Sequence, residues 1–208
     1  MVSPGGVWIG KDKLVLASRS RSRSDLLATC GIAVDLVPAD IDEREIEARE
    51  AGKGMLPTTL ARRLSSEKAL CVSRRLPGRL VLGADQVLDF EDRNLAKSTD
   101  LVEAREKLRR LSAKRHRLIS AAALARDGII LFETIETAEL QMRELSPAQI
   151  DIYLGIVGES VLSSVGAYQV EGMGRLLFER IEGDQAVILG LPLTNLLGYL
   201  RSAEFLAL

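Results

Sequence analysis

The sequence predicts an α/β protein in which helices flank a mixed sheet. Short apolar runs alternate along the chain with segments of helical periodicity. Two strand-like segments, 117–125 and 129–140, surround the turn Arg126-Asp127-Gly128, which is typical of an antiparallel pair. The 208 residues are 47% hydrophobic and 27% charged, a balance that supports a packed core in one domain or two small lobes. Alternating strands and helices with one antiparallel pair are typical of an α/β fold with a mixed sheet.

In the first half of the chain, the sequence predicts three strands and three helices. The expected strands are 14–17, 34–37 and 80–84, each a short apolar run. Residues 22–30 are helical in pattern, and the charge-rich segment 40–50 is expected to be a loop followed by a helix. The clearest pattern is an amphipathic helix over 58–75 that ends before Pro77-Gly78.

The second half begins with another amphipathic helix, 101–111. One face is expected to hold Leu101, Ala104, Leu108 and Leu111, and the opposite face Glu103, Glu106, Lys107 and Arg110. After the strand pair, Ser146-Pro147 predicts a helix start, with serine as N-cap and proline in the first turn. Residues 163–180 and 187–189 are expected to be strands, and Pro192 opens the last helix.

We expect residues 1–11 to be a flexible leader and residues 12–208 to form a single domain. The start of the chain lacks the charged and apolar regions of a signal peptide, and no run reaches the roughly 18 apolar residues of a membrane helix. Cys30 and Cys71 form no CxxC pair, which is typical of reduced thiols. These features predict a cytoplasmic protein with no membrane partner.

Arginine and serine alternate from Ser18 to Ser24, and this stretch has three interpretations. It could be an Arg/Ser repeat that binds RNA, but the net charge of −1 and the isoelectric point near 6.0 argue against a nucleic-acid partner. It could be solvated surface charge. We favour an anion site, because the stretch lies between an apolar strand and a helix, and Ser22-x-x-Asp25 resembles a capping box.

Two further charges lie in unusual places. Lys68 falls beside the apolar stripe of the helix 58–75, so it either extends to water or reaches into a cleft and meets an anion. Asp85 directly follows the strand 80–84, and ligands of α/β sheets bind beyond the carboxyl ends of strands. It is therefore a candidate general base or Mg²⁺ ligand, or else an ordinary turn residue.

Several common sites are not supported by the sequence. There is no GxxxxGK[ST] or GxGxxG pattern, so neither a P-loop nor a Rossmann fingerprint is present. His116 is the single histidine, which argues against a serine–histidine triad or a histidine zinc site and favours a surface or structural histidine at a strand edge.

Seven stretches together resemble the Maf family of nucleoside triphosphate pyrophosphatases, in the family's order and from about residue 14 to 205. They are Leu16-Ala17-Ser18-Arg19-Ser20 with Arg23 and Leu26-Leu27; Ala39-Asp40-Ile41-Asp42-Glu43; Glu67-Lys68-Ala69; Gly83-Ala84-Asp85-Gln86-Val87; Lys97; Gly166-Ala167-Tyr168-Gln169-Val170-Glu171-Gly172; and Phe178-Glu179-Arg180-Ile181-Glu182-Gly183 through Gly190-Leu191-Pro192-Leu193.

The resemblance implies an elongated sheet with two lobes around a central cleft, similar to the inosine triphosphate pyrophosphatases. It also implies hydrolysis of a nucleoside triphosphate to a monophosphate and pyrophosphate with a divalent metal, Mg²⁺ or Mn²⁺, and a possible homodimer. Asp85 would be the catalytic carboxylate and a metal ligand, with Glu43 beside the metal or phosphates. Lys68 would act with Asp85. The triphosphate would be held by Lys68, Lys97, Ser18, Ser20 and Arg23.

The chain departs from the family pattern where specificity and loop shape are set. It has Ser20-Arg21-Ser22-Arg23 in place of Ser-Pro-Arg-Arg, and Lys97-Ser98 in place of Lys-Pro. Gln86 and Glu171 resemble the branch that acts on 7-methyl-GTP, although Ser22 replaces the bulky aromatic common there. A carboxylate can accept both N–H donors of guanine's Watson–Crick edge. We therefore expect Ser22, Gln86 and Glu171 to contact the substrate; the alternatives are a dTTP/UTP pyrophosphatase and a nucleotide-binding regulator of cell division with little turnover.

Overall fold

The computed structural model describes residues 6–43, 45–47 and 55–208, and it confirms the predicted mixed α/β sheet with flanking helices. Within these residues the sheet has seven strands: six follow the order β2-β1-β3-β5-β6-β7, and β4 pairs with β3 outside this path. The pairs β1–β2 and β1–β3 are parallel, whereas β3–β5, β5–β6, β6–β7 and β3–β4 are antiparallel.

Most elements follow the predicted pattern of the sequence. The strands are β1 (Leu14–Leu16), β2 (Val34–Leu36), β3 (Val81–Phe90), β4 (Arg93–Leu95), β5 (Arg115–Arg126), β6 (Ile129–Met142) and β7 (Phe178–Glu182). The α-helices are α1 (Arg21–Thr29), α3 (Pro57–Arg75), α4 (Leu101–Leu111), α5 (Pro147–Val157), α6 (Gln185–Ile188) and α7 (Leu193–Ser202), and two 3₁₀ helices are η1 (Gly158–Ser163) and η2 (Met173–Leu177). Ser146 forms the predicted N-cap of α5, with a complete capping box to Gln149.

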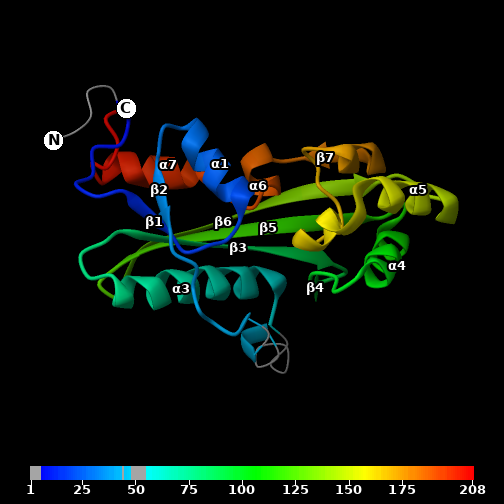
Figure 1. The fold of residues 1–208 in the computed structure, drawn as a ribbon, viewed down its shortest axis with the longest axis horizontal. Helices are drawn as coiled ribbons and strands as arrows, with labels where there is room; N and C mark the ends of the chain where they lie inside the picture. Colours follow the sequence, from blue (N-terminus) through cyan, green and yellow to red (C-terminus); the bar gives the residue numbers. More distant parts are fainter. Residues whose placement is uncertain (1–5, 44, 48–54) are drawn as a thin grey trace.

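The helices form two layers on the long sheet (Figure 1). The long helix α3 covers one face, and α1, α6 and α7 cover the other, while α4 and α5 gather at one end. A large apolar cluster lies at the end of α4 and α5, and a second lies at the end of β1, α1 and α7. The two lobes therefore share one sheet.

The first described residues pack against the C-terminal segment. Val7 and Trp8 lie against the second apolar cluster, and Trp8 stacks on Phe205 with ring centroids 5.6 Å apart. Residues 1–5 of the expected leader lie outside the described residues. Among the helices in the described ranges, none combines the length and the apolar character needed to cross a membrane.

On one edge of the central strand β3, the described strands leave a stretch between Leu82 and Leu88 without a pairing partner. We call this stretch the gap, and the candidate site lies beside it. β5 pairs with Val81–Asp89 along the opposite edge. On the edge with the gap, β1 pairs with Val81 and Leu82, and β4 pairs with Leu88–Phe90. Because β1 is parallel and β4 antiparallel to β3, the carboxyl ends of both strands point into the gap, where ligands of α/β sheets bind.

Three sequence predictions about elements are wrong. Residues 163–177 form turns and 3₁₀ helices, so only the end of the expected strand 163–180 is extended. The expected strand 187–189 overlaps α6 instead, because Asp184 accepts a hydrogen bond from Ala186 N and starts a helix. The helix expected from residue 22 begins at Arg21, and its N-cap is Ser20 rather than Ser22.

Gly83 allows α3 to lie close to β3. A Cβ atom at this position would lie 2.2 Å from Ser65 O and 2.5 Å from Ala69 N, both backbone atoms of α3. Only a residue without a side chain fits there, and the close packing brings Lys68 of α3 within reach of Asp85.

We therefore expect Gly83→Ala to lower the free energy of unfolding by about 3 kcal/mol, measured by urea denaturation, because backbone atoms cannot move as freely as a side chain. Gly155→Ala in α5 is the matched control, since nothing lies within 4 Å of its Cβ position. That variant should be neutral or slightly more stable. Equal stability of both variants would contradict the close packing of α3 on β3.

Candidate active site

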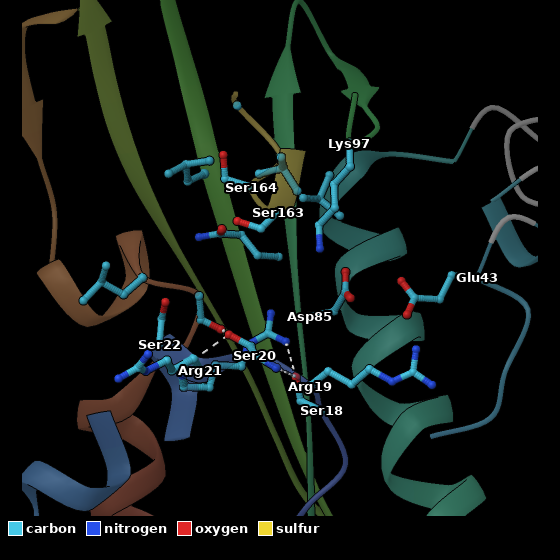
Figure 2. A pocket seen from close by; sticks show the side chains of 18 of the residues that line it. Ser18, Arg19, Ser20, Arg21, Ser22, Glu43, Asp85, Lys97, Ser163 and Ser164 are labelled. Atoms are coloured by element: carbon cyan, nitrogen blue, oxygen red, sulfur yellow. Dashed lines mark hydrogen bonds between the residues drawn. The ribbon is translucent and has the colours of Figure 1, made fainter. Parts of the chain in front are cut away.

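A cavity of about 1330 Å³ opens at the gap beside β3 (Figure 2). Its lining comes from the loop after β1, the start of α1, α3, β3, the exit of β4 and the segments 163–171 and 188–190. The structure brings into this one cavity every residue that the sequence predicted for the site: Ser18, Ser20, Ser22, Arg23, Glu43, Lys68, Asp85, Gln86, Lys97 and Glu171.

The Arg/Ser stretch is a folded turn between β1 and α1. Ser18 Oγ accepts hydrogen bonds from Ser20 N (3.1 Å) and from Arg23 Nη1 (3.0 Å). Ser20 Oγ caps α1 by accepting from Arg23 N at 3.4 Å. The first turn of α1 therefore directs its positive end into the cavity, where an anion is stabilised.

Only one of the three arginines in the stretch is buried. Arg23 donates from Nε to Gly190 O at 2.8 Å, and its burial lowers the pKa of the guanidinium while Asp85 and Glu43 act in the opposite direction. Arg19 is exposed, and the side chain of Arg21 is 94% exposed beside Asp25. Arg23 is thus the fixed cation of this loop.

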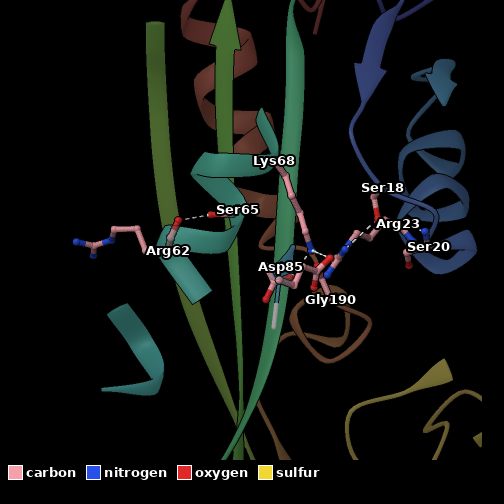
Figure 3. Close-up of polar contacts among 9 residues, drawn as sticks. Ser18, Ser20, Arg23, Arg62, Ser65, Lys68, Asp85 and Gly190 are labelled. Carbon is pink, nitrogen blue, oxygen red and sulfur yellow. Dashed lines mark hydrogen bonds and ion pairs between the residues drawn. The ribbon is translucent and has the colours of Figure 1, made fainter. Parts of the chain in front are cut away.

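The sequence left open whether Lys68 extends to water or reaches into a cleft, and its contacts decide between the two (Figure 3). It does not extend to water: its side chain is 10% exposed, and Nζ lies 2.6 Å from Asp85 Oδ1 and 2.9 Å from Glu43 Oε1. Burying a charge away from water costs free energy unless the charge is paired. The two carboxylates therefore offset the free-energy cost of burying this ammonium.

Asp85 lies in the middle of β3 rather than in a turn after it, which corrects the sequence prediction. The strand continues because β5 pairs along its whole length, while the opposite edge ends its pairing with β1 after Leu82. Asp85 is 6% exposed, and burial raises the pKa of its carboxyl, although Lys68 and Arg23 lower it. A carboxylate with a raised pKa is suited to accept a proton near neutral pH.

Lys97 approaches the cavity from the opposite side. It follows β4, and Figure 2 shows its ammonium directed toward Asp85. Partial desolvation and the positive charge of Arg23 lower the pKa of Lys97, although its side chain is exposed as a whole. Three cations from three separate segments therefore face the same space.

Gln86 is the next residue of β3 after Asp85, so its side chain points to the other face of the sheet, where it contacts α6. Its Nε2 donates to Val187 O (3.0 Å) and Ile188 O (2.9 Å) of α6 and to Ser120 Oγ of β5 (3.2 Å). All three partners accept here, since the Ser120 hydroxyl itself donates to Val187 O, so the amide nitrogen faces them and Oε1 is directed elsewhere. Glu171 lines the cavity from the segment 163–171 and is exposed.

The sequence reasoning missed Glu47. This residue lines the cavity, and burial together with the negative charges of Asp85 and Glu43 raises its pKa. Residues 43 and 45–47 are helical, so the i, i+4 spacing of Glu43 and Glu47 was the available signal. The remainder of the expected helix within 40–50, residues 44 and 48–50, lies outside the described residues.

Two other polar residues, His116 and Ser98, are buried. His116 Nε2 lies 2.6 Å from the hydroxyl of Tyr168, and burial lowers the pKa of His116 to about 4. Of the surface and structural positions that the sequence left open for this histidine, the structure shows the buried, structural one. Ser98, which stands where the family has proline, is 5% exposed, and its hydroxyl has no hydrogen-bond partner within the part of the chain that is described.

The carboxylates fit a hard divalent cation that arrives with a phosphate ligand. Mg²⁺ and Mn²⁺ prefer oxygen ligands, and Mg²⁺ in phosphate sites is usually bound by one or two carboxylates plus phosphate oxygens and water. Glu43 and Asp85 supply two such groups. Within the described ranges, no cluster of three or more His, Cys, Asp or Glu residues forms an all-protein metal site.

Comparison with known proteins agrees with the resemblance seen in the sequence. The family model described as "Maf-like protein" matches residues 13–203. A protein of Rhodopseudomonas palustris named "Nucleoside triphosphate pyrophosphatase" is 49% identical over 201 residues, which is 97% of this chain and 98% of that protein. A Brucella abortus protein named "7-methyl-GTP pyrophosphatase" is 48% identical over 189 residues, 91% of this chain and 95% of that one.

Two solved structures show more distant similarity. A HAM1 protein from Coxiella burnetii has 18% identity and a TM-score of 0.40 over 62% of this chain and 72% of its own. A nucleoside-triphosphatase, named also dITP/XTP pyrophosphatase, from Mycobacterium abscessus has 15% identity and a TM-score of 0.41 over 93% of this chain and 95% of its own. The family model covers nearly the whole chain, and the chain belongs to the Maf family of nucleoside triphosphate pyrophosphatases.

Proposed function

We propose that this Maf protein hydrolyses a modified purine nucleotide of the 7-methyl-GTP type to its monophosphate and pyrophosphate, with Mg²⁺ or Mn²⁺. Such an enzyme removes non-standard nucleotides before they enter nucleic acids. The observation that carries the proposal is a cavity that joins Asp85 with three cations from separate segments.

The cations suit a triphosphate. Arg23, Lys68 and Lys97 come from α1, α3 and the loop after β4, so they surround a ligand rather than form one surface patch. Arginine forks bind phosphate oxygens through two parallel hydrogen bonds, and lysines act as point charges. In this proposal Arg23, Lys68 and Lys97 bind phosphates together with Ser18 and Ser20, whose hydroxyls also shape the turn. The N-terminus of α1 adds its dipole.

Hydrolysis needs an activated water and neutralisation of the leaving pyrophosphate. Asp85 is the group that accepts the proton of the attacking water, since its carboxylate is buried within the cavity beside Lys68. Lys68 and Lys97 stabilise the charge on the leaving group. A divalent cation at Glu43 and Asp85 would add Lewis-acid stabilisation of the phosphates.

Two hydrogen-bond acceptor groups in the cavity favour binding of guanine over thymine or uracil. Gln86 Nε2 is held by carbonyls of α6, which leaves its Oε1 as the group able to meet a ligand. Glu171 adds a carboxylate. Guanine presents two adjacent N–H donors, whereas thymine and uracil present one donor between two acceptors. Methylation at N7 gives the base a positive charge, which a carboxylate attracts.

The test is pyrophosphate release with Mg²⁺ or Mn²⁺ across dTTP, UTP, CTP, GTP and 7-methyl-GTP, with a metal-free arm containing EDTA. We expect 7-methyl-GTP to give the highest kcat/KM and EDTA to stop release. Preference for dTTP or UTP would assign the enzyme to the pyrimidine branch. Nucleotide binding without release from any of them would instead support a nucleotide-binding regulator.

Glu171→Gln should lower the preference for 7-methyl-GTP over UTP by about tenfold, because one carboxylate hydrogen bond to a base edge contributes about 1–3 kcal/mol and the amide supplies only one acceptor. The measurement is the ratio of the two kcat/KM values. Glu179→Gln is the control, since Glu179 is exposed and does not line the cavity. An unchanged ratio in Glu171→Gln would exclude this carboxylate from base recognition.

A further inference from the structure

Lys107 of α4 is buried, which corrects the sequence prediction that it lies with the charged residues opposite the leucines of this helix. It is 7% exposed and lies between the buried residues Ala104 and Leu111 of the same helix. Lysine side chains are almost never buried unless the ammonium has hydrogen-bond or ion-pair partners. The partners of Lys107 therefore indicate its role.

The ammonium of Lys107 joins two loops that are distant in sequence. Nζ donates to Ala96 O and, at 3.0 Å, to Val165 O. Ala96 precedes Lys97, and Val165 lies in the segment 163–171, so both carbonyls belong to residues that line the cavity. Figure 2 shows Lys97, Ser163 and Ser164 in the same part of the cavity lining.

The electrostatic environment of Lys107 keeps the ammonium that bonds to Ala96 O and Val165 O in its charged form. Burial lowers the pKa of Lys107 to about 8, while Glu103 on the same helix raises it and Arg110 lowers it. The ammonium is therefore mostly charged at neutral pH, and hydrogen bonds from a charged donor are about twice as strong as neutral ones. In the described part of the chain, no backbone hydrogen bond outside helices and strands connects these two loops.

We propose that Lys107 is a positioning residue: it holds the loop of Lys97 and the segment 163–171 together as one wall of the cavity, and so sets the affinity for the nucleotide. The inference rests on the proposed function in one respect, namely that Lys97 binds the phosphates. Lys107 itself does not line the cavity and acts through the two loops.

The experiment compares Lys107→Met with wild type and with the matched control Lys114→Met, an exposed lysine paired with Glu91 at the surface. Methionine keeps the apolar stem and removes both hydrogen bonds. We expect the KM for 7-methyl-GTP, or for whichever nucleotide the wild type hydrolyses best, to rise about tenfold while kcat changes by less than about threefold. Hydrogen exchange of the nucleotide-free protein should accelerate in 94–99 and 163–171 and not in β5.

A double-mutant cycle separates positioning from general stability. If Lys107 acts through Lys97, Lys107→Met should raise KM less in the Lys97→Met background than in wild type. Lys107→Gln, which keeps N–H donors but loses the positive charge, should give an intermediate KM, and it replaces the methionine variant if that variant does not fold.

Three results would overturn the proposal: an unchanged KM in Lys107→Met, fully additive effects with Lys97→Met, or faster exchange throughout the protein with a common loss of kcat and stability. Failure of the proposed function is seen separately, because a wild-type protein that releases no pyrophosphate fails before any variant is compared. The exchange measurement on the nucleotide-free protein tests the bridge in either case.

Discussion

Asp85→Asn should abolish pyrophosphate release, with a loss of about a thousandfold or more in kcat, because the amide cannot accept the proton of the attacking water. The change keeps the size of the side chain and leaves Lys68 with Glu43 as a partner. Nucleotide binding, measured by calorimetry, should change by less than about tenfold, since the phosphate-binding cations are untouched.

Asp89→Asn is the matched control in the same strand. Asp89 is buried like Asp85, but it pairs with Arg117 and does not line the cavity. This variant should lose stability through its broken ion pair and keep its kcat. Wild-type turnover in Asp85→Asn would remove Asp85 from the chemistry.

Lys68→Met should lower kcat/KM at least tenfold, a change of about 1.4 kcal/mol in transition-state stabilisation. The ammonium is the group that pairs with both Asp85 and Glu43, so its removal leaves two carboxylates near each other with one cation fewer. It also takes away a charge that stabilises the leaving pyrophosphate. Steady-state kinetics measure the loss, and urea denaturation shows that the variant is folded.

The control for Lys68→Met is Arg63→Met, also on α3. Arg63 is about half exposed and pairs with Glu67 at the surface, where ion pairs contribute little. Its kinetics should equal those of the wild type. If Lys68→Met also had unchanged kinetics, Lys68 would serve only to balance charge within the fold.

Much of the fold was predictable because its signals are local. The helices α3 and α4 have nearly the bounds that their periodicity predicted, and Ser146 caps α5 as expected. The failures are segments without a local signal. Residues 163–177 carry glycines that allow turns as well as strands, and α6 is a short helix whose apolar residues resemble a buried strand.

The site was predictable in its residue list but not in its geometry. The resemblance to the Maf family named ten residues, and all ten line the cavity. Their partners could not be predicted: Lys68 had two possible environments, Asp85 was expected at a strand end, Glu47 was missed, and Lys107 was wrongly expected among the charged residues opposite the leucines of α4. Each of these depends on contacts between segments far apart in the chain.

The sequence by itself determined the α/β class, the main helices, the folded turn between β1 and α1 and the family. Local periodicity and caps specify these elements, and seven motifs in order specify the family. Only the tertiary structure decided that Asp85 lies in a gap between the ends of β1 and β4 and that Lys68 is buried against two carboxylates. The physical reason is that strand pairing and burial depend on residues distant in sequence, which no local pattern encodes.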